Sequence, residues 1–247
     1  MLGSTAGRRH TTGSRVGRLC AVGMLAVVSG CAPDAPRPMP PRLPPPATAE
    51  AGAGGTPTNP LDDPRAPVEV VERAVQAQRQ IKDQAFKVGK DSPLPANRRA
   101  AFQGLNYFPF DARYRFVVKL EPCPKADVIE TATTRADDAR RYRCAGVFRF
   151  TVDGVACSLL ALTPDIGVPD AATDLFIPFR DATSGRETYA AGRYLQLKRR
   201  GADAEYVLDF NQAFNPYCAY GGEYSCPLPP PENHLPVAIR AGEKSPS

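Results

Sequence analysis

The chain contains no tryptophan, and only two histidines occur among its 247 residues. Without tryptophan it lacks the broad aromatic face on which sugar rings stack, which disfavours an enzyme that acts on carbohydrates. His234 is the one histidine outside the N-terminal segment, so any Ser-His-acid or Cys-His arrangement must use it. No strand-to-helix elbow surrounds Ser184. A nucleophilic triad is therefore disfavoured.

Metal ligands and glycine-rich loops are also scarce. Cys218, Cys226 and His234 would give zinc three ligands, but the two cysteines are not at zinc-finger spacing. Residues 183–185, Thr-Ser-Gly, lie between two strand-like segments, which is typical of a turn and not of a phosphate-binding loop before a helix. We therefore predict no cofactor and no metal, with zinc at these three residues as the alternative.

The chain has no apolar run long enough to span a bilayer. Residues 1–30 carry four arginines and no acidic residue, and they include an apolar run of ten residues, Leu19–Val28. A short apolar run after basic residues is typical of a secretory signal. Residues 28–31, Val-Ser-Gly-Cys, resemble a lipobox, in which the cysteine carries the lipid. We predict a lipoprotein signal peptide over residues 1–30 with Cys31 lipidated; an ordinary signal cleaved nearby is the alternative.

Most of the excess positive charge lies in this predicted signal. The whole chain has 31 Lys+Arg and 26 Asp+Glu, and removing the four arginines of residues 1–30 leaves 27 against 26. Nucleic-acid binding needs clustered positive charge on the folded protein. We therefore predict no nucleic-acid partner, and contact with a membrane only through the lipid.

Residues 31–67 contain 12 of the chain's 27 prolines, together with a glycine-rich patch. Such a composition buries little apolar surface and predicts a disordered or polyproline-like stalk. Ala32, directly after the predicted lipidated cysteine, resembles the outer-membrane type in cells with two membranes. We expect the remaining domain to be held off a membrane surface in the cell envelope, facing the periplasm or the exterior.

Residues 68–247 have the length of a single domain, and their first segment is helical in pattern. Residues 68–88 contain no glycine or proline and end before Gly89. Helix-forming residues dominate, and one plausible apolar face carries Val71, Val75, Gln78, Ile81 and Ala85. We predict one N-terminal amphipathic helix over residues 68–88.

Beyond Pro93 the pattern changes to strand period. We expect strands over residues 114–120, 147–152, 155–162, 174–179, 192–198 and 205–210. Asp153-Gly154 is a strong hairpin signal, and a two-residue turn there places Phe150 opposite Cys157, on a core face. The expected fold class is mainly β: an antiparallel sandwich or open barrel with one N-terminal helix.

With Cys31 lipidated and Cys157 in the core, four cysteines of the mature chain remain for disulfides in an exported protein. Cys123 and Cys144 lie at the base of one polar loop, and Cys218 and Cys226 enclose a short turn. We predict both bridges, Cys123–Cys144 and Cys218–Cys226.

Arg193 is the most unusual polar residue. It has the same strand parity as Leu195 and Leu197, so it faces the core if they do, and a buried guanidinium must be paired. One interpretation is an ion pair that joins this strand to the C-terminal segment. The other is a pocket that holds an anionic ligand.

Further polar residues gather in the same part of the sequence. A pair of carboxylates among them could serve as general acid and base, although they could equally cap turns or bind backbone amides. The candidate pocket residues are Arg193, Asp181, Glu187, Tyr189, Asp209, Asn211, Asn215, Tyr217, Glu232 and Asn233.

Several separate motifs carry a family resemblance. They are residues 92–94 (Ser-Pro-Leu), residues 102–109 (Phe-Gln-Gly-Leu-Asn-Tyr-Phe-Pro) and the stretch from Leu175 to Glu243. Together, from Arg79 to Glu243, they resemble the bacterial family catalogued as domain of unknown function 1684. The resemblance implies no activity. We expect a membrane-anchored envelope lipoprotein with a non-catalytic domain that binds an envelope ligand or protein partner; the alternative is a periplasmic hydrolase with a carboxylate pair near Arg193.

Overall fold

The computed structural model describes residues 59–125, 128–165, 174–201 and 203–246. The predicted signal peptide, the predicted lipidation site at Cys31 and most of the predicted stalk lie outside these residues. Among the described residues, no helix has both the length and the apolar character needed to cross a membrane.

The N-terminal helix α1 spans Val68–Val88, the range predicted from its composition. It ends at Gly89, whose amide donates to the carbonyl of Ala85 at 2.9 Å. Its buried residues are Val71, Val75, Lys82 and Phe86. The predicted face was therefore wrong in the second half of the helix, where the partly buried Ile81 and Ala85 give way to Lys82 and Phe86. A paired lysine substitutes there for an apolar residue.

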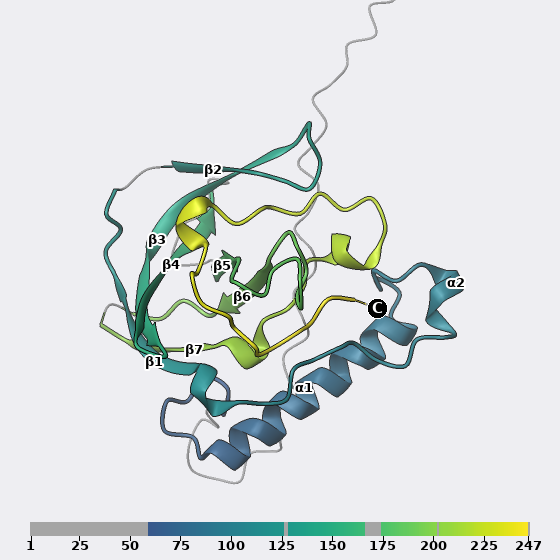
Figure 1. Ribbon diagram of the computed structural model, residues 1–247, viewed down its shortest axis with the longest axis horizontal. Coiled ribbons are helices and arrows are strands. Elements are labelled where there is room, and N and C mark those ends of the chain that lie inside the picture. The colour runs from purple at the N-terminus through teal and green to yellow at the C-terminus, as the bar shows by residue number, and fades with distance from the viewer. Residues whose placement is uncertain (1–58, 126–127, 166–173, 202, 247) are drawn as a thin grey trace, which may run out of the picture. The chain divides into compact units, whose positions relative to one another are not determined.

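One antiparallel sheet forms the body of the protein. Its strands follow the order β6-β5-β4-β3-β1-β7, and β2 pairs with β3 beside this path. The sheet curls into a half-barrel, as Figure 1 shows, which confirms the predicted mainly β class in its open-barrel form. The strands are β1 (Arg115–Glu121), β2 (Val128–Ala132), β3 (Ala139–Val152), β4 (Val155–Pro164), β5 (Leu175–Phe179), β6 (Arg193–Leu197) and β7 (Glu205–Asp209).

The hairpin between β3 and β4 has the predicted register. Val152 pairs with Val155, and Phe150 pairs with Cys157. Asp153 and Gly154 both have positive φ, 47° and 83°, as a two-residue hairpin turn requires. Cys157 is 6% exposed within the main hydrophobic core, so its predicted structural role is confirmed.

The hydrophobic core includes part of the C-terminal segment. Leu235, Ile239 and Ala241 are buried in the same cluster as the core residues of the strands. The chain after residue 225 runs across the mouth of the curled sheet in Figure 1. The inner face of the half-barrel is therefore covered by the protein's own chain.

Helix α1 packs against loop residues. Leu61, only 1% exposed, clusters with Val71 and Val75 of α1 and with Phe110. Arg115 of β1 donates to the carbonyls of Pro60, Leu61 and Asp63. Residues 59–67, which their composition assigns to the stalk, therefore belong to the folded domain, because a buried leucine and an arginine clamp hold them there.

Short helical turns complete the structure. Helix α2 (Ala96–Arg99) follows α1, and 3-10 turns lie further along the described part of the chain. The turns Phe210–Gln212 and Tyr217–Tyr220 matter for the sites described below, because they place polar groups beside α1. The 3-10 turns within the described residues are Ala112–Tyr114, Phe210–Gln212, Tyr217–Tyr220 and Pro231–Asn233.

Candidate functional site

Arg193 lies at the start of β6, with only 1% of its surface exposed. One terminal nitrogen donates to the carbonyls of Ala241 and Glu243, and the other donates to the carbonyl of Ile239 at 2.8 Å and to Asp181 Oδ2 at 2.9 Å. Burial lowers the pKa of Arg193, and the adjacent carboxylate of Asp181 opposes that shift. The inward orientation predicted from strand parity is confirmed. The guanidinium pairs with Asp181 and joins β6 to the C-terminal segment, which confirms the ion-pair interpretation. The alternative interpretation, a ligand pocket at Arg193, was wrong.

Asp181 has no free carboxylate oxygen. Its Oδ2 accepts from Arg193, while Oδ1 accepts from the amide and hydroxyl of Thr183 and from the amide of Ile239. This carboxylate thus caps its own turn and pairs with the buried arginine. It cannot act as a general acid or base in this arrangement because every oxygen is bonded and it is 7% exposed.

Asp209 and Asn211 form a second closed network at the end of β7. Asp209 is fully buried and accepts from Arg115 at 3.0 Å and from the amide and side chain of Asn211. Asn211 also exchanges hydrogen bonds with the backbone of Asp111. These contacts fasten β1 to β7 and occupy the polar atoms of both side chains.

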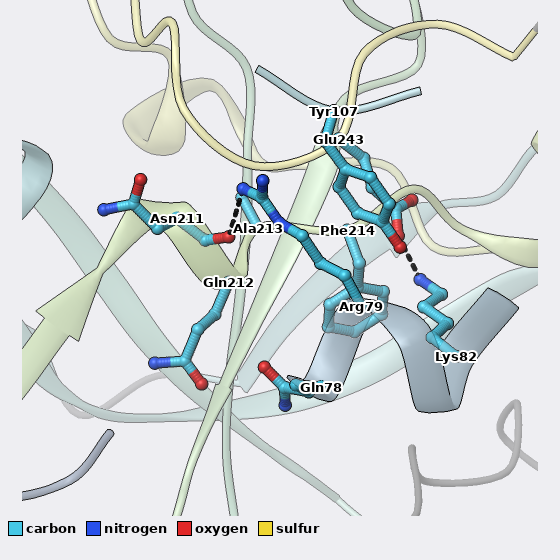
Figure 2. Close-up of a pocket in the computed structure, with 9 residues that line it drawn as sticks. All are labelled: Gln78, Arg79, Lys82, Tyr107, Asn211, Gln212, Ala213, Phe214 and Glu243. Atoms are coloured by element: carbon cyan, nitrogen blue, oxygen red, sulfur yellow. Dashed lines mark hydrogen bonds and ion pairs between the residues drawn. The ribbon is translucent and has the colours of Figure 1, made fainter. Parts of the chain in front are cut away.

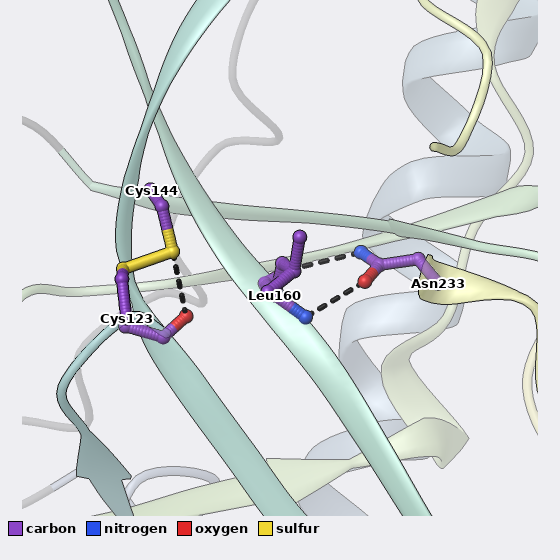
Figure 3. Close-up of a disulfide and its surroundings, with 5 residues drawn as sticks. Cys123, Cys144, Leu160 and Asn233 are labelled. Atoms are coloured by element: carbon purple, nitrogen blue, oxygen red, sulfur yellow. Dashed lines mark hydrogen bonds between the residues drawn. A yellow bond between two sulfur atoms is a disulfide. The ribbon is translucent and has the colours of Figure 1, made fainter. Parts of the chain in front are cut away.

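The side chain of Asn233 forms hydrogen bonds with strand backbone, in place of a neighbouring strand. Its side chain accepts from the amide of Leu160 at 2.7 Å and donates to the carbonyls of Leu160 and Pro178. Figure 3 shows this pairing against β4. Asn233 therefore completes the hydrogen bonding where β4 and β5 diverge, which is a structural role.

The remaining predicted pocket residues are scattered. Glu187 forms an exposed ion pair with Arg240, and Glu232 is exposed. Tyr217 contacts the ring of Phe86 edge-on. The predicted carboxylates therefore do not converge on one open cleft, because two are buried in closed networks and two lie on the surface.

One of the two predicted disulfides is present. Cys123 and Cys144 are bonded and join the end of β1 to β3 (Figure 3). Cys218 and Cys226 are free thiols, so the predicted second bridge is corrected. The Cys218 sulfur lies 3.8 Å from the hydroxyl of Tyr189.

A pocket lies between α1 and the segment that follows β7. It is small, with about 20 Å³ of space for water-sized groups, and it opens to solvent. Figure 2 shows the side chains around it. The lining residues are Gln78, Arg79, Lys82, Tyr107, Asn211, Gln212, Ala213, Phe214 and Glu243.

Lys82 and Glu243 form a buried ion pair on one side of the pocket (Figure 2). The second oxygen of Glu243 accepts from the amide of Asn215 at 2.8 Å and from the hydroxyl of Tyr220. Lys82 also lies 5.1 Å from the centre of the Phe214 ring. Both charges are thus satisfied by the protein, and they cancel each other.

Arg79 differs from Lys82 because no carboxylate is among its hydrogen-bond partners in the described structure. Its terminal nitrogens donate to the carbonyls of Phe108 at 3.0 Å and Asn211 at 3.4 Å, and its guanidinium lies 4.5 Å from the centre of the Tyr107 ring. Its Nε is buried without a hydrogen-bond partner. Burial lowers the pKa of Arg79, and the more distant charge of Glu243 partly offsets this.

The charge of the pocket follows from these two descriptions. Lys82 and Glu243 sum to zero, so Arg79 leaves one positive charge at the wall of the pocket. Glu243 is the one carboxylate among the described lining residues, and both of its oxygens are bonded. The arrangement can therefore hold an anionic group, but it does not present a pair of carboxylates for hydrolysis.

Sequence reasoning missed Arg79, Lys82, Tyr107 and Glu243 as a group. Lys82 and Glu243 are 161 positions apart, and no local pattern relates them. One signal was available: Val71, Val75, Lys82 and Phe86 share one helical face, so a lysine among apolar residues indicates a buried, paired charge.

Comparison with known proteins agrees with the fold and supplies no activity. The chain is similar to the solution NMR structure of the uncharacterized protein from gene locus rrnAC0354 of Haloarcula marismortui. The two chains share 36% sequence identity with a TM-score of 0.56, over 71% of this chain and 95% of that chain. No curated protein matches. Residues 100–244 match the family described as "Protein of unknown function (DUF1684)", and the chain therefore belongs to that family.

Proposed function

We propose that this protein is a lipid-anchored protein of the cell envelope whose β domain binds an envelope ligand without transforming it. The pocket beside Arg79 is the proposed binding site, and the ligand carries a small anionic group, a carboxylate or a phosphate. The anchor proposal rests on the signal-like residues 1–30 and on Cys31. The binding proposal rests on the pocket and its charge.

The carrying observation is the incomplete pairing of Arg79. Its guanidinium is partly desolvated, its Nε has no partner, and its contact to the carbonyl of Asn211 is long at 3.4 Å. An anion in the pocket that replaces the long contact to the Asn211 carbonyl would accept a charge-assisted hydrogen bond from Nη2, which is roughly twice as strong as a neutral one. The side-chain amides of Gln78 and Gln212, which line the pocket, can add further hydrogen bonds.

Replacing Arg79 with glutamine is expected to weaken binding of inorganic phosphate or acetate roughly 10- to 100-fold, the value of a lost charge-assisted hydrogen bond. The measurement is an NMR titration of the protein with each anion, following the Arg79 Nε–H resonance in the wild type. Phosphate and acetate are titrated separately, and the anion that binds more tightly indicates whether the ligand carries a phosphate or a carboxylate.

Arg73→Gln is the matched control for this titration. Arg73 lies on the same helix but is exposed, so its removal changes the net charge equally without touching the pocket. Binding unchanged by Arg73→Gln and lost with Arg79→Gln supports the site. If the Arg79 Nε–H resonance stays fixed while either anion reaches tens of millimolar, the pocket does not bind anions and the proposal fails.

Replacing Cys31 with serine is expected to abolish incorporation of labelled palmitate, because serine has no thiol to accept the lipid. The measurement is metabolic labelling with palmitate followed by fractionation of membranes. Cys20→Ser, in the apolar run of the predicted signal, is the matched control and should retain the label. Label that persists in Cys31→Ser would contradict the anchor.

A further inference from the structure

The pocket beside Arg79 has a net positive charge, which limits the negative charge that an occupant can bring. Among its described lining residues, Arg79 and Lys82 are positive and Glu243 is negative. Lys82 and Glu243 are paired with each other, so the excess charge lies on Arg79. Burial raises the pKa of Tyr107, so its hydroxyl stays protonated and adds no charge. A monoanion would therefore neutralise the lining, whereas a dianion would leave a negative charge without a partner.

Two further carboxylates act on Arg79 from outside the lining residues. Asp209 at the end of β7 is paired with Arg115, so its charge is compensated. Asp83 of α1 is partly buried, and its Oδ1 accepts from the amide of Leu105 at 3.0 Å. Burial raises the pKa of Asp83, and in its ionised form Asp83 adds negative potential at Arg79. This potential disfavours a doubly charged occupant further, because like charges repel across a short distance.

The size of the pocket limits its occupant as well. About 20 Å³ is open to water-sized groups, and a single water needs roughly 10–15 Å³. The space therefore admits about one or two oxygen atoms. A carboxylate presents two oxygens in one plane, and its carbon chain can remain at the mouth, which opens to solvent. A tetrahedral phosphate or sulfate presents more oxygens than the space can hold.

The walls of the pocket combine hydrogen-bond donors with aromatic rings. Nη2 of Arg79 donates to a backbone carbonyl at a long distance of 3.4 Å, and an anion oxygen can take the place of that carbonyl. Gln78 and Gln212 supply side-chain amides, which are neutral donors. Figure 2 shows the rings of Tyr107 and Phe214 among the same side chains. Such walls suit a charged group carried on carbon atoms, because the rings offer apolar contacts to the carbon.

We propose that the pocket binds the carboxylate of a monocarboxylic acid and rejects phosphate and sulfate dianions. One carboxylate oxygen accepts from Nη2 of Arg79, and the charges of the two groups cancel. This inference rests on the proposed anion-binding function and narrows it to one ligand class. Charge and size both favour the carboxylate, since a dianion brings one negative charge too many and a tetrahedral group is too large for the space.

The test is an NMR titration of the unmodified protein with acetate, methanesulfonate and sulfate, following the Arg79 Nε–H resonance near neutral pH at constant ionic strength. Each of these anions keeps a fixed charge at that pH, so the comparison does not depend on ligand ionisation. Acetate and methanesulfonate are monoanions of different size, and sulfate is a dianion. We expect acetate to bind roughly tenfold or more tightly than sulfate, because of the uncompensated charge. Methanesulfonate should bind more weakly than acetate, because its third oxygen does not fit.

Gln78→Lys tests the charge argument without altering Arg79. The substitution adds a second positive charge at the pocket wall, so the affinity for sulfate should rise roughly tenfold relative to the affinity for acetate. Gln78→Met is the matched control, because it changes the same side chain without adding charge, and it should keep the preference for acetate. Gln78 is partly exposed on α1, and lysine and methionine are both good helix formers. An unchanged ratio of the two affinities in Gln78→Lys would contradict the charge argument.

The outcomes separate this inference from the proposed function. If none of the three anions shifts the Arg79 resonance, the pocket binds no anion and both fail. If sulfate binds as tightly as acetate to the unmodified protein, the anion-binding function stands and the choice of a monoanion is overturned. Methanesulfonate that binds as tightly as acetate would overturn the choice of a carboxylate. A preference for acetate over both other anions, which Gln78→Lys shifts toward sulfate, supports the inference.

Discussion

Replacing Arg193 with methionine is expected to lower the free energy of unfolding by about 3–5 kcal/mol, because it leaves Asp181 as an uncompensated buried charge. The substitution also removes the donors that serve the carbonyls of Ile239, Ala241 and Glu243. A domain of this size melts roughly 2–4 °C lower for each kcal/mol lost, so the melting temperature should fall by roughly 6–20 °C. The measurement is urea and thermal unfolding followed by circular dichroism.

Arg240→Met is the matched control for Arg193→Met. Arg240 also forms an arginine–carboxylate pair, with Glu187, but its side chain is 58% exposed. An exposed pair contributes about 0–1 kcal/mol, so this variant should unfold almost as the wild type does. If the two variants unfold alike, the buried network around Arg193 does not hold the C-terminal segment on the sheet.

The contact between Arg193 and Asp181 can also be tested by removing both charges together. In the double variant Arg193→Met with Asp181→Asn, the buried charge is removed together with its partner. Part of the lost stability should return, since a neutral buried amide is less costly than an unpaired carboxylate. If the stability lost in the double variant equals the sum of the losses in the two single variants, the two residues act independently.

Replacing Glu243 with glutamine is expected to be about as damaging, at about 3–5 kcal/mol, because Lys82 is then buried without a counter-charge. Lys82 and Glu243 side chains are 5% and 1% exposed, so water cannot compensate for the loss. The substitution also weakens the acceptor of the Tyr220 hydroxyl and the Asn215 amide. Chemical unfolding of the variant measures the effect.

Glu121→Gln supplies the comparison for Glu243→Gln. Glu121 pairs with Arg149 on the sheet, and both side chains are about half exposed, at 49% and 58%. Loss of this pair should change stability by less than about 1 kcal/mol. A Glu243→Gln protein that unfolds at the same urea concentration as Glu121→Gln would contradict the account of the Lys82–Glu243 pair as the anchor between α1 and the C-terminus.

These two buried pairs explain how the proposed pocket keeps its shape. Glu243 is held from α1 by Lys82 and from the 3-10 turn Tyr217–Tyr220 by Tyr220. Its own carbonyl accepts from Arg193 of β6. Arg79 therefore projects into a pocket whose opposite wall is fixed to the sheet. A rigid wall lowers the entropy that a ligand must overcome on binding.

Local patterns were enough to predict several elements of the fold. Helix α1 was predicted at its observed bounds because helix formers run without glycine or proline from Val68 to Val88. The Asp153-Gly154 turn determined the pairing of Phe150 with Cys157, since a two-residue hairpin leaves one register. Strand parity placed Arg193 in the core, and Cys123–Cys144 followed from their positions at the ends of strands.

The candidate site was less predictable, because it depends on groups far apart in the chain. The sequence left a pocket at Arg193 as one of two interpretations. The segment from Leu235 to Ala241 packs into the mouth of the sheet and supplies that arginine with carbonyl partners instead. The sequence could not show that residues 59–67 return to the domain, because their contact with Arg115 joins segments more than fifty positions apart.

The sequence by itself determined a β-rich domain with one N-terminal helix, its hairpin register and the burial of Arg193, because period and turn chemistry act between near neighbours. Only the tertiary structure decided which charges meet. Lys82 finds Glu243, Arg193 finds Asp181, and Arg79 is left with carbonyls and an aromatic ring. Which charges pair in a core depends on which side chains lie close together in space, and no local sequence pattern encodes that. In this protein the pairing leaves the positive charge of Arg79 at the pocket.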